Sequence, residues 1–300
     1  YESLYSQIDA SPALSPDGSM LFYIADQEVD TKEELYVVDL SGQVPGPPVK
    51  LSANNVTLVA TARWSPDSTR VAYVDDIANF YTLFVVSVGA PGVALQVSPT
   101  TLVNEVNISS VYYENPFASG STSTDAPGTA GFTFSPDGTK IAFVAGTTVG
   151  STANDVLLVA NVNSTGVVVS QVGATSGMEV SSYAWAPDST GIAYVGDLET
   201  TGVAELFHVD LTSFPLPGAP LKLSRTPVPT NGDVYSASTG VHFFGGRKLI
   251  YRGDDRLDIA VEAVMVDFTI PSAIVHTPLS NPAASTAFLV TNLRIQPGKP

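Results

Sequence analysis

Short runs of β-branched and aromatic residues recur along the whole chain, and Gly, Pro, Asp and Ser separate them. Val71-Ala72-Tyr73-Val74 and Ile192-Ala193-Tyr194-Val195 are two such runs, each long enough for one strand. No segment keeps a sustained 3.6-residue period of apolar positions, so we expect almost no helix. The pattern therefore predicts an all-β protein made of many short strands.

A four-residue turn motif sets the spacing of these strands. Its copies are Ser15-Pro16-Asp17-Gly18, Ser65-Pro66-Asp67-Ser68, Ser135-Pro136-Asp137-Gly138 and Ala186-Pro187-Asp188-Ser189. Seven positions after each proline stands an aromatic residue: Tyr23, Tyr73, Phe143 or Tyr194. Counting back seven from Tyr251 gives a degraded fifth copy, Phe243-Phe244-Gly245-Gly246. Proline and aspartate suit the two central positions of a type I turn, so we interpret the four aspartates as turn formers.

Each motif belongs to a unit of four strand-like runs with a period of about 50 residues, which predicts a β-propeller of four-stranded antiparallel blades. Trp64, Phe134 and Trp185 directly precede three of the turns, so we expect them at equivalent positions on the innermost strands. We expect a single domain over 1–300 with an insertion at 101–129 and five complete repeats, at about 12–55, 61–99, 131–173, 182–226 and 240–281. Residues 284–300 read as the start or remnant of a sixth. Either residues 1–10 close the ring by pairing with it, or the protein continues beyond Pro300.

These units resemble the TolB-like Pro-Asp repeat, a WD-like propeller repeat that is also similar to the propellers of prolyl-oligopeptidase-class enzymes and the tricorn protease. The Pro-Asp motifs, the aromatic residue seven positions on, and Leu35-Tyr36-Val37-Val38-Asp39-Leu40 carry the resemblance. It implies a propeller fold but no particular activity, because the same blades serve as docking platforms, substrate gates and sugar-binding modules. The sequence shows neither the α/β domain of TolB nor a hydrolase domain, so neither activity is carried over.

The composition narrows the class of partner. Thirteen Lys and Arg stand against 29 Asp and Glu, a formal net charge of −16, so we expect no nucleic-acid partner. The chain has no Cys, which excludes disulfides, thiolate zinc sites and a cysteine nucleophile. No apolar run approaches the 18 residues or more of a membrane span, so we expect no membrane insertion. The acidic, cysteine-free composition favours an extracytoplasmic location in a bacterium, whether periplasmic, on the cell surface or secreted.

Catalytic motifs are missing from the sequence, and the three histidines, His208, His242 and His276, fall inside predicted strands. We therefore expect no enzyme activity. Acidic residues follow the second strand of several units, among them Asp75 and Asp76, and should gather on the face opposite the Pro-Asp turns. The densest group is Asp254, Asp255 and Asp258, whose carboxylates could bind calcium. The alternative is that these residues form solvated loops of an acidic protein, with no cofactor at all.

The insertion is the other feature that the fold does not require. Tyr112, Tyr113, Glu114 and Phe117 lie in it, and aromatic side chains supply contact area at low entropic cost. We expect this segment on the same face as the acidic loops, either as a recognition element or as a lid folded onto the rim.

Three functions fit this sequence. The first is a non-catalytic binding or scaffold propeller that docks a protein, peptide or glycan on the face carrying the acidic loops and the insertion. The second is a gating or substrate-selecting propeller of a larger hydrolase. The third is a repeat module of an extracellular surface assembly, in which neighbouring chains associate with one another.

Overall fold

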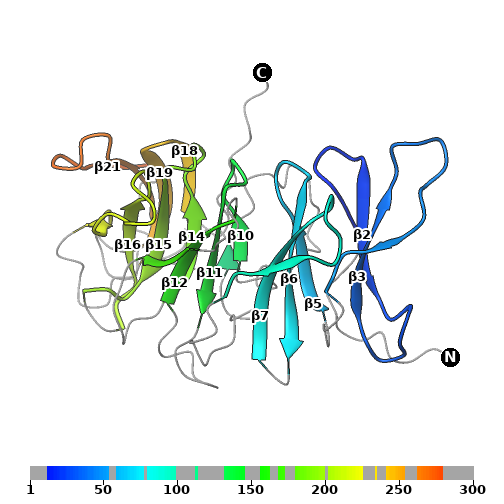
Figure 1. Cartoon of the computed structure of the whole chain (residues 1–300). Coiled ribbons are helices and arrows are strands. Elements are labelled where there is room, and N and C mark those ends of the chain that lie inside the picture. The colour runs from blue at the N-terminus through cyan, green and yellow to red at the C-terminus, as the bar shows by residue number, and fades with distance from the viewer. Residues whose placement is uncertain are drawn as a thin grey trace, which may run out of the picture.

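The residues that the structure describes form five antiparallel four-stranded sheets, one of them extended by a short parallel strand, set side by side in a curved row (Figure 1). This is a β-propeller built from repeated blades, so the predicted fold class is confirmed. The structure, a computed structural model, describes residues 12–53, 59–77, 80–98, 112–113, 132–145, 156–162, 168–172, 180–199, 202–225, 234, 241–253 and 262–279. The predicted partial sixth unit at 284–300 and its proposed partner at 1–10 lie outside these residues.

Each blade is a meander in which every strand pairs with the next one along the chain. Blade 1 contains β1 (Ala13–Leu14), β2 (Met20–Ala25), β3 (Glu34–Asp39) and β4 (Val49–Lys50), and blade 2 contains β5 (Val59–Trp64), β6 (Arg70–Ile77), β7 (Phe80–Ser87) and β8 (Ala94–Gln96). Blade 3 contains β10 (Phe132–Phe134), β11 (Lys140–Ala145), β12 (Val156–Asn161) and β13 (Val169–Val172). Blade 4 contains β14 (Val180–Trp185), β15 (Gly191–Gly196), β16 (Glu205–Asp210) and β17 (Leu221–Lys222), and blade 5 contains β18 (Val241–Gly245), β19 (Lys248–Gly253), β20 (Glu262–Asp267) and β21 (Val275–Pro278). A short strand, β9 (Tyr112–Tyr113), adds to blade 4 by parallel pairing with β14.

The hydrophobic core consists of four layers, one between each pair of successive blades. Blade 4 is covered on both sides, and every residue of β15 is buried, because its run of Ile, Ala, Tyr and Val contacts a neighbouring sheet in both directions. Blade 5 lies at one end of the row, and in β19 buried and less buried residues alternate. The continuous apolar runs in the sequence therefore mark blades enclosed on both faces.

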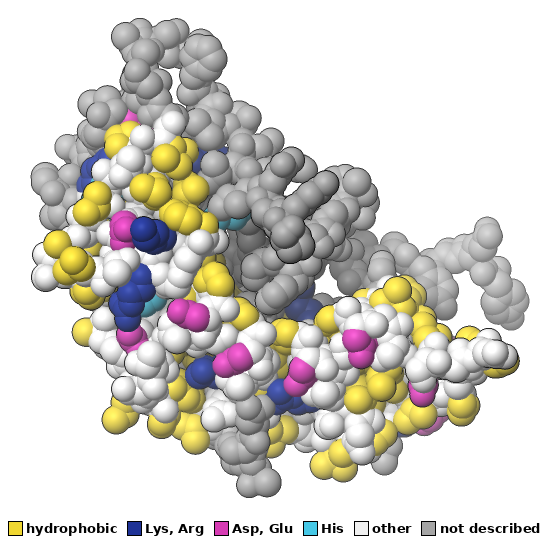
Figure 2. Space-filling model, turned by 90° about the horizontal axis from the view of Figure 1, so that it is seen from above, with side chains coloured by type: hydrophobic (Ala, Val, Ile, Leu, Met, Phe, Trp, Pro, Cys, Tyr) yellow, Lys and Arg dark blue, Asp and Glu magenta, His cyan; other side chains and the backbone are white. Residues whose placement is uncertain are grey.

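The meander gives the row two faces. The Pro-Asp turns join first to second strands, so they lie at the same end as the loops between third and fourth strands; we call this end the turn face. The hairpins between second and third strands lie at the opposite end, the hairpin face. In Figure 1 the turn face is at the top, and Figure 2, seen from above, shows Asp and Glu side chains following one another along it.

The Pro-Asp turns have the geometry that the motif predicts. The Ser135 hydroxyl donates to Asp137 Oδ1 at 2.6 Å, and the same oxygen accepts the Thr139 backbone N–H at 2.9 Å. The last turn position has a positive φ in all four copies, and it is glycine in two turns and serine in the other two: Gly18, Ser68, Gly138 and Ser189. The aspartates are therefore turn formers, as expected.

The serines at that last position also tie one blade to the previous one. Ser68 Oγ in blade 2 accepts the backbone N–H of Asp17 in blade 1 at 3.2 Å, and Ser189 Oγ in blade 4 accepts that of Asp137 in blade 3 at 3.0 Å. The contacts between blades 1 and 2 and between blades 3 and 4 are therefore built in the same way.

The tryptophans before the turns repeat this pairing. Trp64 and Trp185 end the first strands of blades 2 and 4, and Phe134 ends that of blade 3, so their predicted equivalence is confirmed. Trp64 Nε1 donates to the Ala13 carbonyl of blade 1 at 2.9 Å, and Trp185 Nε1 donates to the Thr133 carbonyl of blade 3 at 3.4 Å.

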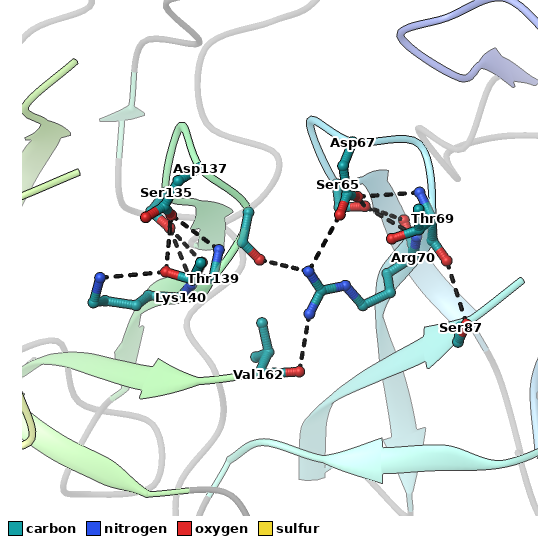
Figure 3. A network of polar contacts seen from close by, with 11 residues as sticks. Ser65, Asp67, Thr69, Arg70, Ser87, Ser135, Asp137, Thr139, Lys140 and Val162 are labelled. Carbon is teal, nitrogen blue, oxygen red and sulfur yellow. Dashed lines mark hydrogen bonds and ion pairs between the residues drawn. The ribbon is translucent and has the colours of Figure 1, made fainter. Parts of the chain in front are cut away.

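An arginine joins blades 2 and 3 in a different way (Figure 3). Arg70, at the start of β6, donates from one guanidinium nitrogen to the Val162 carbonyl at 2.9 Å and from the other to the Gly138 carbonyl at 2.8 Å. Its second nitrogen also lies 3.5 Å from Asp67 Oδ2 in its own turn. One side chain thus fixes the Pro-Asp turn of blade 2 against that of blade 3.

Candidate functional site

The predicted site residues fall partly outside the described part of the chain. Glu114, Phe117, Asp254, Asp255 and Asp258 all lie there, and of Asp76, Tyr112 and Tyr113 only the strand backbone is described. The placement of Asp75 was wrong. We expected it in an exposed loop after the second strand, but β6 runs on to Ile77 and Asp75 is 1% exposed.

Buried carboxylates recur at the hairpin face. Glu34, Glu205 and Glu262 are the first residues of the third strands in blades 1, 4 and 5, and each is at most 2% exposed. In blade 2 the carboxylate sits on the neighbouring strand, because Asp75 of β6 pairs with Thr82 at the corresponding rung of β7. Four of the five blades therefore bury one acidic side chain at the same level of the fold.

In blade 1 a lysine of the fourth strand neutralises this buried anion. Lys50 Nζ lies 3.0 Å from Glu34 Oε1 and 2.6 Å from Oε2 of Glu28, an exposed residue of the hairpin loop. Lys32 Nζ is 3.4 Å from Glu34 Oε1, and the Tyr36 hydroxyl donates to Oε2 at 3.0 Å. Burial alone would raise the pKa of Glu34, but the hydrogen bonds from Lys50 and Tyr36 lower it below its ordinary value, so this carboxyl is ionised at neutral pH.

Blade 4 repeats the arrangement with different residues. Lys222, at the position of Lys50, bridges the buried Glu205 and the exposed Glu199, which lies 2.7 Å from its ammonium nitrogen. In blade 5 the matching fourth-strand position is Pro278, which has no charge to offer. There Arg225, which follows β17 of blade 4, takes the role, with a nitrogen 3.5 Å from Glu262 Oε2.

These bridges leave the described hairpins of blades 1 and 4 negative. The hairpin segments 26–34 and 197–205 hold eight Asp and Glu residues, against three ammonium groups once Lys50 and Lys222 are counted with Lys32. All three lysines form ion pairs with carboxylates of these segments. Asp26, Glu28, Asp30 and Glu199 are exposed, so the net charge that a partner meets here is negative.

Sequence reasoning missed these bridging residues, although the sequence carries a signal for them. Glu-Leu-Tyr at 34–36 and Glu-Leu-Phe at 205–207 are copies of one pattern, and so are Lys50-Leu51-Ser52 and Lys222-Leu223-Ser224. The serines also recur as acceptors, since Ser52 and Ser224 Oγ accept backbone N–H groups of Leu35 and Leu206. Because the Glu position and the Lys position repeat together in two units, the sequence indicates a contact that recurs within the repeat.

Two other kinds of site are absent from the described residues. No three His, Asp or Glu side chains there gather closely enough to hold a metal ion. The same part of the chain contains no long apolar helix of the kind that spans a membrane.

The fold is a β-propeller, and the comparisons with known proteins add to this at the level of fold. No protein-family model and no curated protein matches the chain. A structure described as a dipeptidyl aminopeptidase IV from Bacteroides ovatus matches with a TM-score of 0.51 at 14% identity, over 85% of this chain and 34% of that one.

Two further structures are similar at lower scores. Dipeptidyl peptidase 4 from Porphyromonas gingivalis matches with a TM-score of 0.48 at 15% identity, over 93% of this chain and 47% of that one. A structure described as a TolB from Agrobacterium tumefaciens matches with a TM-score of 0.43 at 15% identity, over 90% and 80%. Membership in the TolB-like repeat family stays a prediction from the repeat motif.

Proposed function

We propose that this propeller is a non-catalytic binding module that docks a basic protein or peptide segment on its hairpin face. The observation that carries the proposal is the charge of that face, where every described lysine is already paired and exposed carboxylates remain. A basic partner would be attracted over a distance of about a Debye length, roughly 10 Å at 0.1 M salt, and would bind less strongly as salt rises. An extracytoplasmic location belongs to the same proposal and rests on the cysteine-free, acidic composition.

Two residues that take no part in the lysine bridges allow a clean test. Asp26 and Asp30 are exposed on the hairpin loop of blade 1, and changing both to Asn alters the net charge by two units. A matched control, Gln43→Lys with Leu216→Lys, makes the same change of net charge at exposed positions of the turn face. A photo-crosslinking residue at position 28 or at position 43 then reports which face the partner contacts in extracts of the native source.

The proposal predicts partner crosslinks from position 28, loss of those crosslinks in the Asp26→Asn, Asp30→Asn variant, and no loss in the control. Crosslinks confined to position 43, or equal losses in both variants, would show that the hairpin face is not the docking surface.

The alternative is the propeller part of a larger hydrolase. The observation that favours this alternative is the match to the Bacteroides ovatus structure, which covers 34% of a chain described as a dipeptidyl aminopeptidase. Peptidase activity in a protein purified from the native source with this propeller, and its loss when the propeller is deleted, would support this alternative. Calcium binding by Asp254, Asp255 and Asp258, and glycan binding through it, stay predictions.

A further inference from the structure

A histidine occupies a core position where the other blades have aliphatic residues or methionine. His208 lies on β16 opposite Ala193 and is 4% exposed. The residues at the same rung of the other third strands are Val37, Val85, Val159 and Met265. An apolar side chain therefore satisfies the packing at this position, and the fold does not require an imidazole.

A glycine makes room for the imidazole. Gly191 begins β15, and a Cβ atom placed on it would lie 2.3 Å from His208 Nε2. The other second strands begin with long side chains at this position, namely Met20, Arg70, Lys140 and Lys248. Blade 4 thus differs from its neighbours at two adjacent positions, and the two differences fit each other.

The imidazole packs into the contact between blades 4 and 5. Its ring lies 4.8 Å from that of Phe268 and 6.4 Å from that of Phe243, both of blade 5. Nε2 is buried and has no hydrogen-bond partner within the part of the chain that the structure describes. An imidazolium here would have no acceptor for that N–H, and its charge would be poorly solvated.

Three charged groups face this site. Arg247 in the β18–β19 turn of blade 5 lies 2.7 Å from Asp210 Oδ2 of β16, and Asp188 comes from the Pro-Asp turn of blade 4. Burial is the main cause and the Arg247 charge the second, and together they lower the pKa of His208 to about 4 against the smaller opposing effects of Asp210 and Asp188. The closed contact therefore holds the neutral imidazole.

We propose that His208 makes the contact between blades 4 and 5 an acid-sensitive latch, which holds while the imidazole is neutral and loosens when it is protonated. In the open state the imidazole has its ordinary pKa of 6.5. As pH falls below 6.5, the imidazole therefore binds a proton in the open state but stays neutral in the closed state. The closed contact loses stability as pH falls from 6.5 toward 4. Because the pKa of His208 is 6.5 in the open state and about 4 in the closed state, the equilibrium constant for opening should be roughly 20-fold larger at pH 5 than at pH 7.

Hydrogen exchange of the full chain at pH 5 and pH 7, corrected for intrinsic exchange rates, measures this opening directly. Amides of β16, β18 and β19 should open roughly 20-fold more at pH 5, whereas amides at the contact between blades 1 and 2 should change much less. His208→Val installs the residue found in blades 1, 2 and 3, and His208→Gln keeps a polar side chain that does not titrate. Both variants should lose the difference between the two pH values, even if the lost packing raises exchange at both.

An NMR titration of the His208 imidazole gives an independent measurement. A pKa near 4 supports the latch, and a pKa of 6 or above would overturn it. A pH ratio near one in the unmodified protein, or an unchanged ratio in both variants, would overturn it as well.

Discussion

Lys50 forms ion pairs with two carboxylates, one buried and one exposed. Removing each pair in turn should show how much more the buried one contributes to the free energy of unfolding. In a Lys50→Met variant the methylene stem is largely kept while Glu34, whose side chain is 1% exposed, loses its nearest cation. Breaking a buried ion pair from one side typically costs 3–5 kcal/mol. Because Lys32 and the Tyr36 hydroxyl still contact Glu34, we expect a loss of about 2–4 kcal/mol in the free energy of unfolding.

The matched control removes the exposed partner of the same ammonium. The Glu28 side chain is 53% exposed, so Glu28→Gln should cost only about 0–1 kcal/mol, as is usual for surface ion pairs. Urea unfolding followed by tryptophan fluorescence measures both variants, since Trp64 lies in the adjacent blade. Equal costs for Lys50→Met and Glu28→Gln would refute the claim that burial of Glu34 makes this bridge matter.

The Lys50→Met variant should also change how stability depends on pH. The pKa of Glu34 is lowered in the folded state, so its contribution to stability is present above its ordinary value of 4.5 and is lost as pH falls below it. Without Lys50 that lowering is weaker, and the unfolding free energy should fall less steeply between pH 5 and pH 3. A slope unchanged from that of the unmodified protein would contradict this assignment.

Three further substitutions test the contacts between and within blades. Gly191→Ala should lower the free energy of unfolding by about 1–3 kcal/mol through overpacking against His208 and the Val209 carbonyl, and adding His208→Val should restore only the part of the loss that the imidazole causes, in the same urea assay. Arg70→Met should cost about 1–3 kcal/mol by leaving two carbonyls without their donor, with the largest rise in hydrogen exchange between blades 2 and 3; a rise spread evenly over all blades would contradict its role there. Asp137→Ala should cost about 0.5–2 kcal/mol and leave partner binding unchanged, and lost binding at an unchanged melting temperature would mean that this aspartate is more than a turn former.

The repeat made the fold predictable, because Pro-Asp spacing and the aromatic residue seven positions on are local signals. The equivalent positions of Trp64, Phe134 and Trp185 could be predicted for the same reason, because each residue directly precedes a turn. The placement of Asp75 failed because the end of β6 depends on pairing with β7, and burial of a carboxylate inside a strand has no signal in a single sequence. The bridge from Lys50 to Glu34 spans 16 residues and depends on strand register, so the repeat could suggest it but only the structure could show the contact.

The alternation of contacts along the row has a mechanical consequence. Blades 1 and 2, and likewise blades 3 and 4, are joined by a tryptophan and a serine that reach back to the previous blade, whereas an arginine makes the step from blade 2 to blade 3. Stretching the chain by its ends in an optical trap compares these two kinds of contact, because blades come away in pairs where the tryptophan and serine contacts outlast the arginine contact and singly where they do not. Blades 1 and 2 span 84 residues and blades 3 and 4 span 91, so an event that releases a pair should free roughly 300 Å of chain at about 3.5 Å per residue, about twice the length freed by a single blade.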